Sequence, residues 1–274
     1  MDADGVRLAG EATGDGTPIV LLHGLTATRR YVVMGSRALE RAGHRVIAYD
    51  ARGHGASDPA AAPGDYEYER LARDLEAVLD AGGVSRAVLA GASMGAHTLL
   101  ALALRAPQRV AGMVLITPSY DGSDFDAPER LARWDALAAG LRGGGVEGFL
   151  AAYGEPDVPP AWRETVLRVI RQRLSLHTHP AAVADALSVV PRSRPFRTLE
   201  DLAALREVPS AVVASDDAAD PGHPRAVGEA YARLLGAELV TDAPGRSPVA
   251  WQGSQVSAVI VRVAQRATRE RAPD

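Results

Sequence analysis

A serine between small residues stands directly after an apolar run, in Gly91-Ala92-Ser93-Met94-Gly95. Residues 86–90 are predicted to form a strand and residues 95–105 a helix, so Ser93 occupies the turn between them. Such a turn exposes the hydroxyl in front of the positive end of the helix, and it needs glycines because its arms approach closely. We therefore predict a nucleophilic serine. The alternative is a tight turn in which Ser93 only caps the helix.

The elements that must position this serine alternate between strand and helix. The continuous apolar run at 18–22 is typical of a central parallel strand that is covered on both faces. Residues 45–49 and 110–117 read as further strands, with an edge strand at 6–12 and helices at 31–42 and 66–81. This alternation predicts a mostly parallel sheet with right-handed crossovers.

The pattern changes after the strand at 110–117, because residues 119–205 contain no convincing strand. Helices are predicted there at 127–141, 146–152, 161–175 and 179–190. The sheet resumes at 210–214, followed by a helix at 225–235, a strand at 238–241 and a helix at 251–266. The chain therefore divides into a core of residues 1–118 and 206–274 and an inserted helical cap at 119–205, which we expect to set substrate choice.

Four motifs together, LLHGLTA, YDARGHGAS, GASMG and DPGHP, resemble the α/β-hydrolase superfamily over nearly the whole chain. The resemblance implies an α/β fold with an eight-stranded, mostly parallel sheet, a helical cap and a pocket between them. It also implies an oxyanion hole formed by the backbone N–H groups of Leu25 and Met94. The family's order of catalytic residues is serine, then an acid, then a histidine.

The acid is expected in the loop after the strand at 210–214, where the chain offers Asp216, Asp217 and Asp220. The stretch Asp220-Pro221-Gly222-His223-Pro224 resembles the family's D-P-x-x-P and favours Asp220. Asp217 is the runner-up because this loop is longer than usual.

The base is expected after the last strand, in a loop resembling P-G-H-S-P, but the chain reads Pro244-Gly245-Arg246-Ser247-Pro248. Arginine stays protonated near neutral pH and cannot take a proton from serine. His223 is the tentative substitute because it lies on the loop of the acid. A packing role fits the other six histidines better, namely His23, His44, His54, His97, His177 and His179. A further alternative is that no histidine acts as the base.

The composition of the chain limits the classes of partner and cofactor that we expect. The 274 residues carry a net charge of −4, so neither nucleic acid nor an anionic membrane is an expected partner. Cysteine is absent, and the pair His177-x-His179 lacks a third ligand, so we expect no metal or other cofactor. The acidic N-terminus has no apolar signal segment, which favours a cytoplasmic location.

These patterns lead to one functional hypothesis and two alternatives. The leading hypothesis is hydrolysis of a small or medium carboxylic ester or lactone through an acyl-Ser93 intermediate, with a non-standard triad and a small-molecule substrate. The alternatives are a lyase or cyclisation catalyst and a ligand-binding protein on the same fold. Three arginines where the cap returns to the core could clamp an anionic substrate, although a solvated linker fits them better; they are Arg192, Arg194 and Arg197.

Overall fold

The computed structural model describes residues 1–123, 125–241 and 251–269. Seven strands form one sheet in the order β3-β5-β4-β6-β7-β8-β9, and all neighbours are parallel except β3 and β5. Their bounds are Gly10–Thr13 (β3), Thr17–Leu22 (β4), His44–Tyr49 (β5), Ala87–Ala92 (β6), Val110–Ile116 (β7), Ser210–Ala214 (β8) and Glu238–Thr241 (β9). The predicted mostly parallel sheet is confirmed.

The count of eight strands is wrong for the described residues, which place seven in the main sheet. The predicted edge strand at 6–12 is divided. Val6–Arg7 (β2) pairs with Asp2–Ala3 (β1) in a separate hairpin, and only Gly10–Thr13 joins the edge of the sheet beside β5. A seven-residue strand therefore does not form, because its first residues pair locally.

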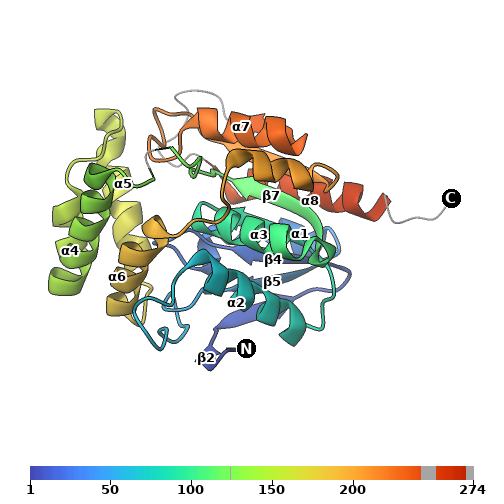
Figure 1. Ribbon diagram of the computed structural model, residues 1–274, viewed down its shortest axis with the longest axis horizontal. Helices are drawn as coiled ribbons and strands as arrows, with labels where there is room; N and C mark the ends of the chain where they lie inside the picture. The colour runs from blue at the N-terminus through green and yellow to red at the C-terminus, as the bar shows by residue number, and fades with distance from the viewer. Residues whose placement is uncertain (124, 242–250, 270–274) are drawn as a thin grey trace.

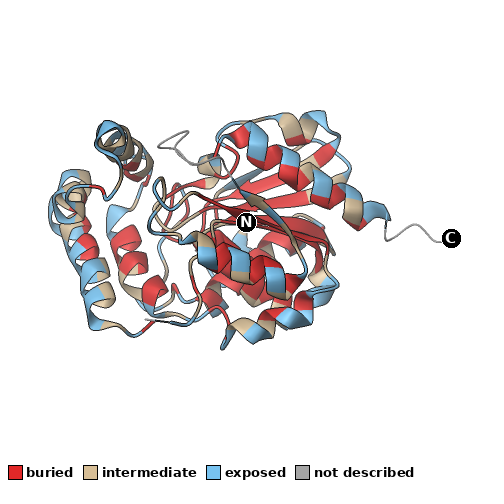
Figure 2. Ribbon diagram, turned by 90° about the horizontal axis from the view of Figure 1, so that it is seen from above, coloured by how far each residue is buried: buried red, intermediate tan, exposed pale blue. Residues whose placement is uncertain are grey.

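Helices cover both faces of the sheet (Figure 1). On β4, Val20 and Leu22 pack toward Tyr68–Ala81 (α2), Met94–Arg105 (α3) and Arg225–Leu235 (α7). Ile19 and Leu21 pack toward Ala38–Arg41 (α1) and Gly253–Arg269 (α8). Because successive side chains of a strand point to opposite faces, a continuous apolar run supplies both cores. Figure 2 shows these buried strands between helices whose outer faces are exposed.

The predicted helix at 31–42 is mostly wrong. The structure has a short 3-10 helix at Arg29–Tyr31 and only four α-helical residues in α1. Met34 and Gly35 between them have positive φ angles of 46° and 76°, which a right-handed helix does not allow. The helix predicted to start at 251 begins at Gly253 and continues to Arg269.

Between β7 and β8 the described residues form three α-helices, Pro128–Tyr153 (α4), Pro160–Leu174 (α5) and Pro180–Val189 (α6), and two 3-10 helices, Val190–Arg192 (η3) and Leu199–Leu205 (η4). The two helices expected at 127–141 and 146–152 form one segment, α4, with a kink at Gly145 (φ 60°, ψ −145°). In Figure 1 the three helices gather beyond one end of the sheet. They share an apolar cluster of their own that includes Leu137, Phe149, Leu174 and Leu187.

The segment that returns from these helices packs with the core instead. Phe196, Leu202 and Leu205 belong to the same apolar cluster as Tyr231 of α7. The limits of the cap at 119 and 205 remain a prediction. Within the described residues, no helix is both long enough and apolar enough to cross a membrane.

Candidate active site

Ser93 lies on a sharp turn between β6 and α3. Its backbone has φ 49° and ψ −111°, a conformation that non-glycine residues rarely adopt. A Cβ at Gly91 would lie 2.3 Å from the carbonyl carbon of Gly95, and one at Gly95 would lie 2.4 Å from the carbonyl oxygen of Leu22. Side chains at these two positions would collide with backbone, so the strained turn requires both glycines.

His223 and Asp220 come to Ser93 from the loop after β8. His223 Nε2 lies 2.9 Å from Ser93 Oγ, and His223 Nδ1 lies 2.7 Å from Asp220 Oδ1. The carboxylate can only accept, so Nδ1–H donates to it and Nε2 is left to accept the serine hydroxyl proton. The structure thus joins the three predicted residues in one hydrogen-bonded chain, with the side chains of His223 and Asp220 25% and 28% exposed.

Local turns of this loop place the acid and the histidine together. The N–H of Asp220 donates to Asp216 O, and the N–H of His223 donates to Asp220 O, both at 3.0 Å. Asp217, the runner-up for the acid, instead accepts from the N–H of Arg225 at the start of α7, at 2.7 Å. Asp217 therefore interacts with the N-terminus of α7, where the helix dipole stabilises a carboxylate. Arg246 lies outside the described residues.

The N–H groups of Leu25 and Met94 are available for an oxyanion. Neither donates to an acceptor within the described residues, and both residues line the cavity that Ser93 and His223 also line. Met94 is the first residue of α3, where an N–H has no partner inside the helix. Two backbone donors beside a nucleophile can stabilise the charge of a tetrahedral intermediate.

Histidines hold the loop that carries Leu25. His23 Nε2 accepts from the N–H of Ala51 at 2.9 Å, so its Nδ1 donates to Gly24 O at 2.8 Å. His54 Nε2 lies 2.6 Å from Leu25 O. His177, after α5, accepts from the N–H of Gly55 through Nδ1 and faces Thr26 O at 3.2 Å through Nε2. Three consecutive carbonyls are thereby fixed, and with them the direction of the Leu25 N–H.

His97 is also buried at the cavity wall, but its ring nitrogens face other groups. Its Nε2 accepts from the N–H groups of Ser119 and Tyr120, each at 3.3 Å, and its Nδ1 lies 3.1 Å from the Tyr68 hydroxyl. Burial, and then the charge of His223, lower the pKa of His97 to about 3. His97 is therefore neutral near pH 7 and supports the wall.

The remaining two histidines lie away from Ser93. His44 begins β5, at the opposite edge of the sheet from the turn that carries Ser93. His179 precedes α6.

The main cavity lies between the carboxyl ends of the strands and the cap and has a volume of about 740 Å³. Helices α4 and α5 supply much of its lining, including Trp134, Phe149, Val166 and Val169. Three arginines also line it, Arg130, Arg133 and Arg173. The arginines singled out from the sequence are placed elsewhere: Arg192 and Arg194 form exposed ion pairs with Asp135 and Asp126.

Sequence reasoning missed the pocket arginines. Arg171 and Arg173 lie on the same helix, α5, but Arg171 pairs with Glu147 at the surface whereas Arg173 lines the cavity. No signal in the local sequence separates the two.

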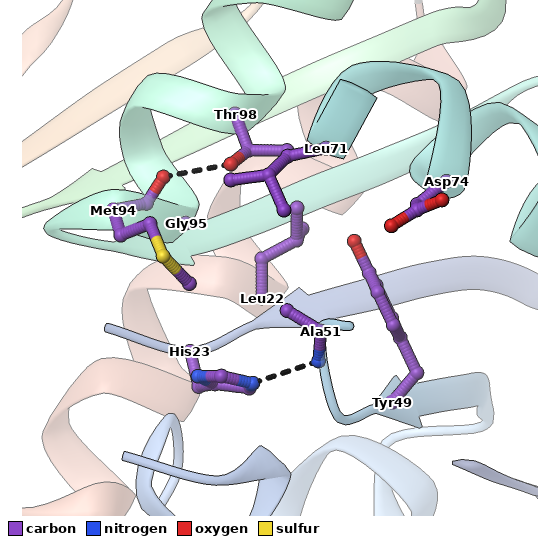
Figure 3. Close-up of a pocket in the computed structure, with 9 residues that line it drawn as sticks. All are labelled: Leu22, His23, Tyr49, Ala51, Leu71, Asp74, Met94, Gly95 and Thr98. Carbon is purple, nitrogen blue, oxygen red and sulfur yellow. Dashed lines mark hydrogen bonds between the residues drawn. The ribbon is translucent and has the colours of Figure 1, made fainter. Parts of the chain in front are cut away.

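A second, much smaller cavity of about 10 Å³ lies beneath the turn that carries Ser93, which we call the elbow, between His23, Tyr49 and Met94 (Figure 3). It has room for about one water molecule. Asp74 at its edge receives a two-pronged, buried ion pair from Arg52 at 2.6 and 2.7 Å. This space therefore belongs to the support of the loops. The described residues contain no group of acids and histidines that could hold a metal ion.

Comparison with known proteins agrees with this architecture. The family described as alpha/beta hydrolase fold matches residues 17–158. A putative carbamate hydrolase, RutD, of Variovorax paradoxus is 33% identical over 213 residues, which is 76% of each chain. A hydrolase structure from Pseudomonas aeruginosa superimposes with a TM-score of 0.72 at 31% identity and covers 99% of this chain and 97% of its own.

Other solved structures share the architecture over nearly the full length. Est816, described as an N-acyl homoserine lactone degrading enzyme, has a TM-score of 0.72, 26% identity and 99% coverage of both chains. The enol-lactonase of Burkholderia xenovorans, at 24% identity and a TM-score of 0.70, covers 98% of both chains and shares the fold. With its elbow, its sheet order and these matches, the chain belongs to the α/β-hydrolase family and is a hydrolase.

Proposed function

We propose that the protein hydrolyses a small or medium carboxylic ester or lactone through an acyl-Ser93 intermediate. The observation that carries this proposal is the hydrogen-bonded chain from Ser93 Oγ through His223 to Asp220. It supplies a nucleophile, a base within reach of its proton and a carboxylate that orients the base. The acid and the base come from one loop, which compensates for arginine at the usual histidine position.

Each group has one role in the two half-reactions. Ser93 Oγ attacks the ester carbonyl while His223 Nε2 takes the hydroxyl proton, and the N–H groups of Leu25 and Met94 bind the oxyanion. Collapse of the tetrahedral intermediate breaks the bond to the alcohol oxygen, which receives the proton from His223. Water then attacks the acyl-serine with the same base, which releases the acid and restores Ser93.

The names of the relatives support a substrate bond of the ester or lactone kind. The carbamate hydrolase relatives and Est816 are named for reactions at a carbonyl flanked by a heteroatom. Ester and lactone carbonyls are activated in the same way. We propose that this protein's substrates are small molecules of that kind, and that the cap selects among them because its helices line the cavity.

A fluorophosphonate probe tests the nucleophile directly. Intact-mass measurement should show one adduct on the unmodified protein and none on Ser93→Ala. Ser119→Ala is the matched control, because Ser119 lines the same cavity and should leave labelling unchanged. Equal labelling of Ser93→Ala and the unmodified protein would remove Ser93 from this role.

Product analysis in ¹⁸O-water tests the reaction class. Hydrolysis should place one ¹⁸O in the released acid. An ester or lactone converted without uptake of ¹⁸O points to a lyase or cyclisation reaction, and tight binding without any turnover points to a binding protein.

A further inference from the structure

The wall of the main cavity holds a guanidinium, that of Arg173, which has no counter-ion among the described residues. Arg173, on α5, donates through Nη2 to Thr26 Oγ1, but its Nε is buried and has no acceptor among the described residues. No acidic side chain of the described residues lies within ion-pair distance of it. Arg173 lines the cavity that Ser93 and His223 also line.

Several other arginines of the cap do have acidic partners. On α5 itself, Arg163 pairs with Glu155 and Arg171 with Glu147. Burial lowers the pKa of Arg173, and the charge of Asp220 opposes that effect. A buried cation without a hydrogen-bonded anion is costly, and such a group is stabilised when a ligand brings the anion.

The acids that share the cavity do not fill this role. Asp220 binds His223, Asp121 accepts from Ser123, and Asp157 is exposed. A second cation, Arg130, also lines the cavity without an ion pair among the described residues and donates to the carbonyls of Phe125 and Pro191. As far as the structure describes the chain, the cap side of the cavity therefore presents positive charge without an ion-pair partner.

We infer that the substrate carries a carboxylate in addition to its reacting ester, and that Arg173 binds this carboxylate. The inference rests on the proposed function. Two N–H groups of a guanidinium form a planar fork that matches the two oxygens of a carboxylate. Because Arg173 also holds Thr26, the residue after Leu25, the anion is bound next to the oxyanion loop. Monoesters of short dicarboxylic acids and lactones that bear a carboxylate fit this arrangement.

Two matched esters test the inference. The p-nitrophenyl monoester of glutarate carries a free carboxylate, and p-nitrophenyl methyl glutarate has the same chain with that group blocked. The unmodified protein should show a kcat/KM at least about tenfold higher for the charged ester, mainly through KM, because hydrogen bonds to a charged group are stronger than those between neutral groups.

Arg173→Gln should bring this ratio close to one, and Arg173→Lys should restore part of it. Arg171→Gln is the control, since Arg171 lies two positions away on α5 but pairs with Glu147 at the surface; it should keep the full preference. An equal loss on both esters in Arg173→Gln would mean that Arg173 only positions the Thr26 loop, and this result overturns carboxylate binding.

Calorimetry with glutarate and butyrate separates this inference from the proposed function. Glutarate should bind more tightly than butyrate to the unmodified protein and to Arg171→Gln, and the difference should vanish in Arg173→Gln. That result supports the carboxylate site even if Ser93 is not labelled and neither ester is hydrolysed. In that case the proposed function is wrong and the carboxylate site remains. Hydrolysis of both esters without preference, with equal binding of the two acids, overturns the inference and leaves the proposed function in place.

Discussion

His223 and Asp220 are three residues apart on one loop, and this spacing shapes the site. In the arrangement that the sequence motifs imply, the acid and the histidine come from separate loops. Here one turn carries both, and the N–H of His223 donates to Asp220 O. The side chains are therefore oriented by the local backbone geometry of a single turn.

His223→Ala tests the base. We expect kcat to fall by about 10²–10⁴-fold, because proton transfer from Ser93 loses its acceptor. The melting temperature should change little, since the side chain is partly exposed. His179→Ala, a histidine beside α6 that does not line the cavity, should leave kcat unchanged. A loss of less than threefold in His223→Ala would return the search for a base to His97.

At the scale of elements, the elbow depends on how closely β6, α3 and β4 approach. Gly95 is packed against the carbonyl of Leu22, so β4 and the start of α3 are in backbone contact. The same contact brings Gly24 beside Ser93, because a Cβ on Gly24 would lie 3.6 Å from the Cβ of Ser93. Close packing of these elements thus sets the distance between Ser93 and the loop that carries Leu25.

Gly95→Ala should be destabilised by about 1–3 kcal/mol and should lose most of its activity, because the new methyl must displace backbone. Gly143→Ala is the matched control in α4, where a Cβ has open space. Alanine is the better helix former there, so this variant should be unchanged or more stable by up to about 1 kcal/mol. Urea unfolding measures both. Wild-type stability and activity in Gly95→Ala would contradict the packing argument.

The cap and the core are joined at the oxyanion loop by the segment between α5 and α6. His177 contacts Gly55 and Thr26, and the N–H of Thr178 donates to Gly55 O at 2.8 Å. Arg173 adds a bond to Thr26 Oγ1. The cap helices that line the cavity therefore contact the loop that carries Leu25, so we expect a change in the cap to alter kcat as well as substrate preference.

For the whole molecule, buried neutral histidines link stability to pH. Burial lowers the pKa of His97 and of His177 to about 3 each, whereas an unfolded histidine titrates near 6.5. Between these values the unfolded state binds protons that the folded state does not. The contribution of these neutral histidines to the free energy of unfolding is complete above pH 6.5. It is therefore lost progressively as the pH falls toward 3.

His97→Gln should make this acid-side loss shallower by up to about 1.4 kcal/mol per pH unit between pH 6 and pH 4. Glutamine retains an acceptor for the N–H groups of Ser119 and Tyr120 but does not titrate. The quantity to compare is the slope of the unfolding free energy against pH, since the substitution also shifts its absolute value. His179→Gln, which lies outside this buried cluster, should keep the original slope. An unchanged slope in His97→Gln would mean that His97 does not titrate differently on unfolding.

Local sequence determined the elements that are strongly patterned. The apolar run at 18–22, the Gly91-x-Ser93-x-Gly95 turn and the helices on either side of it follow from short-range periodicity and from steric demands within a few residues. The same reasoning placed helices between β7 and β8. It failed at residues 31–42 and 6–12, where a helical or strand-like pattern is overridden by positive φ angles or by a competing hairpin.

Only the tertiary structure decided how the site is assembled. The sequence favours His223 because it lies on the loop of the acid, but its contact with Ser93 spans 130 residues and is set by long-range packing. Spacing does not reveal that Asp217 binds the start of α7, or that Arg173 faces the cavity while Arg171 faces solvent. These choices depend on which side chains the packed sheet and cap bring together. The sequence by itself therefore determined the turn that exposes a nucleophile, and long-range packing determined its partners.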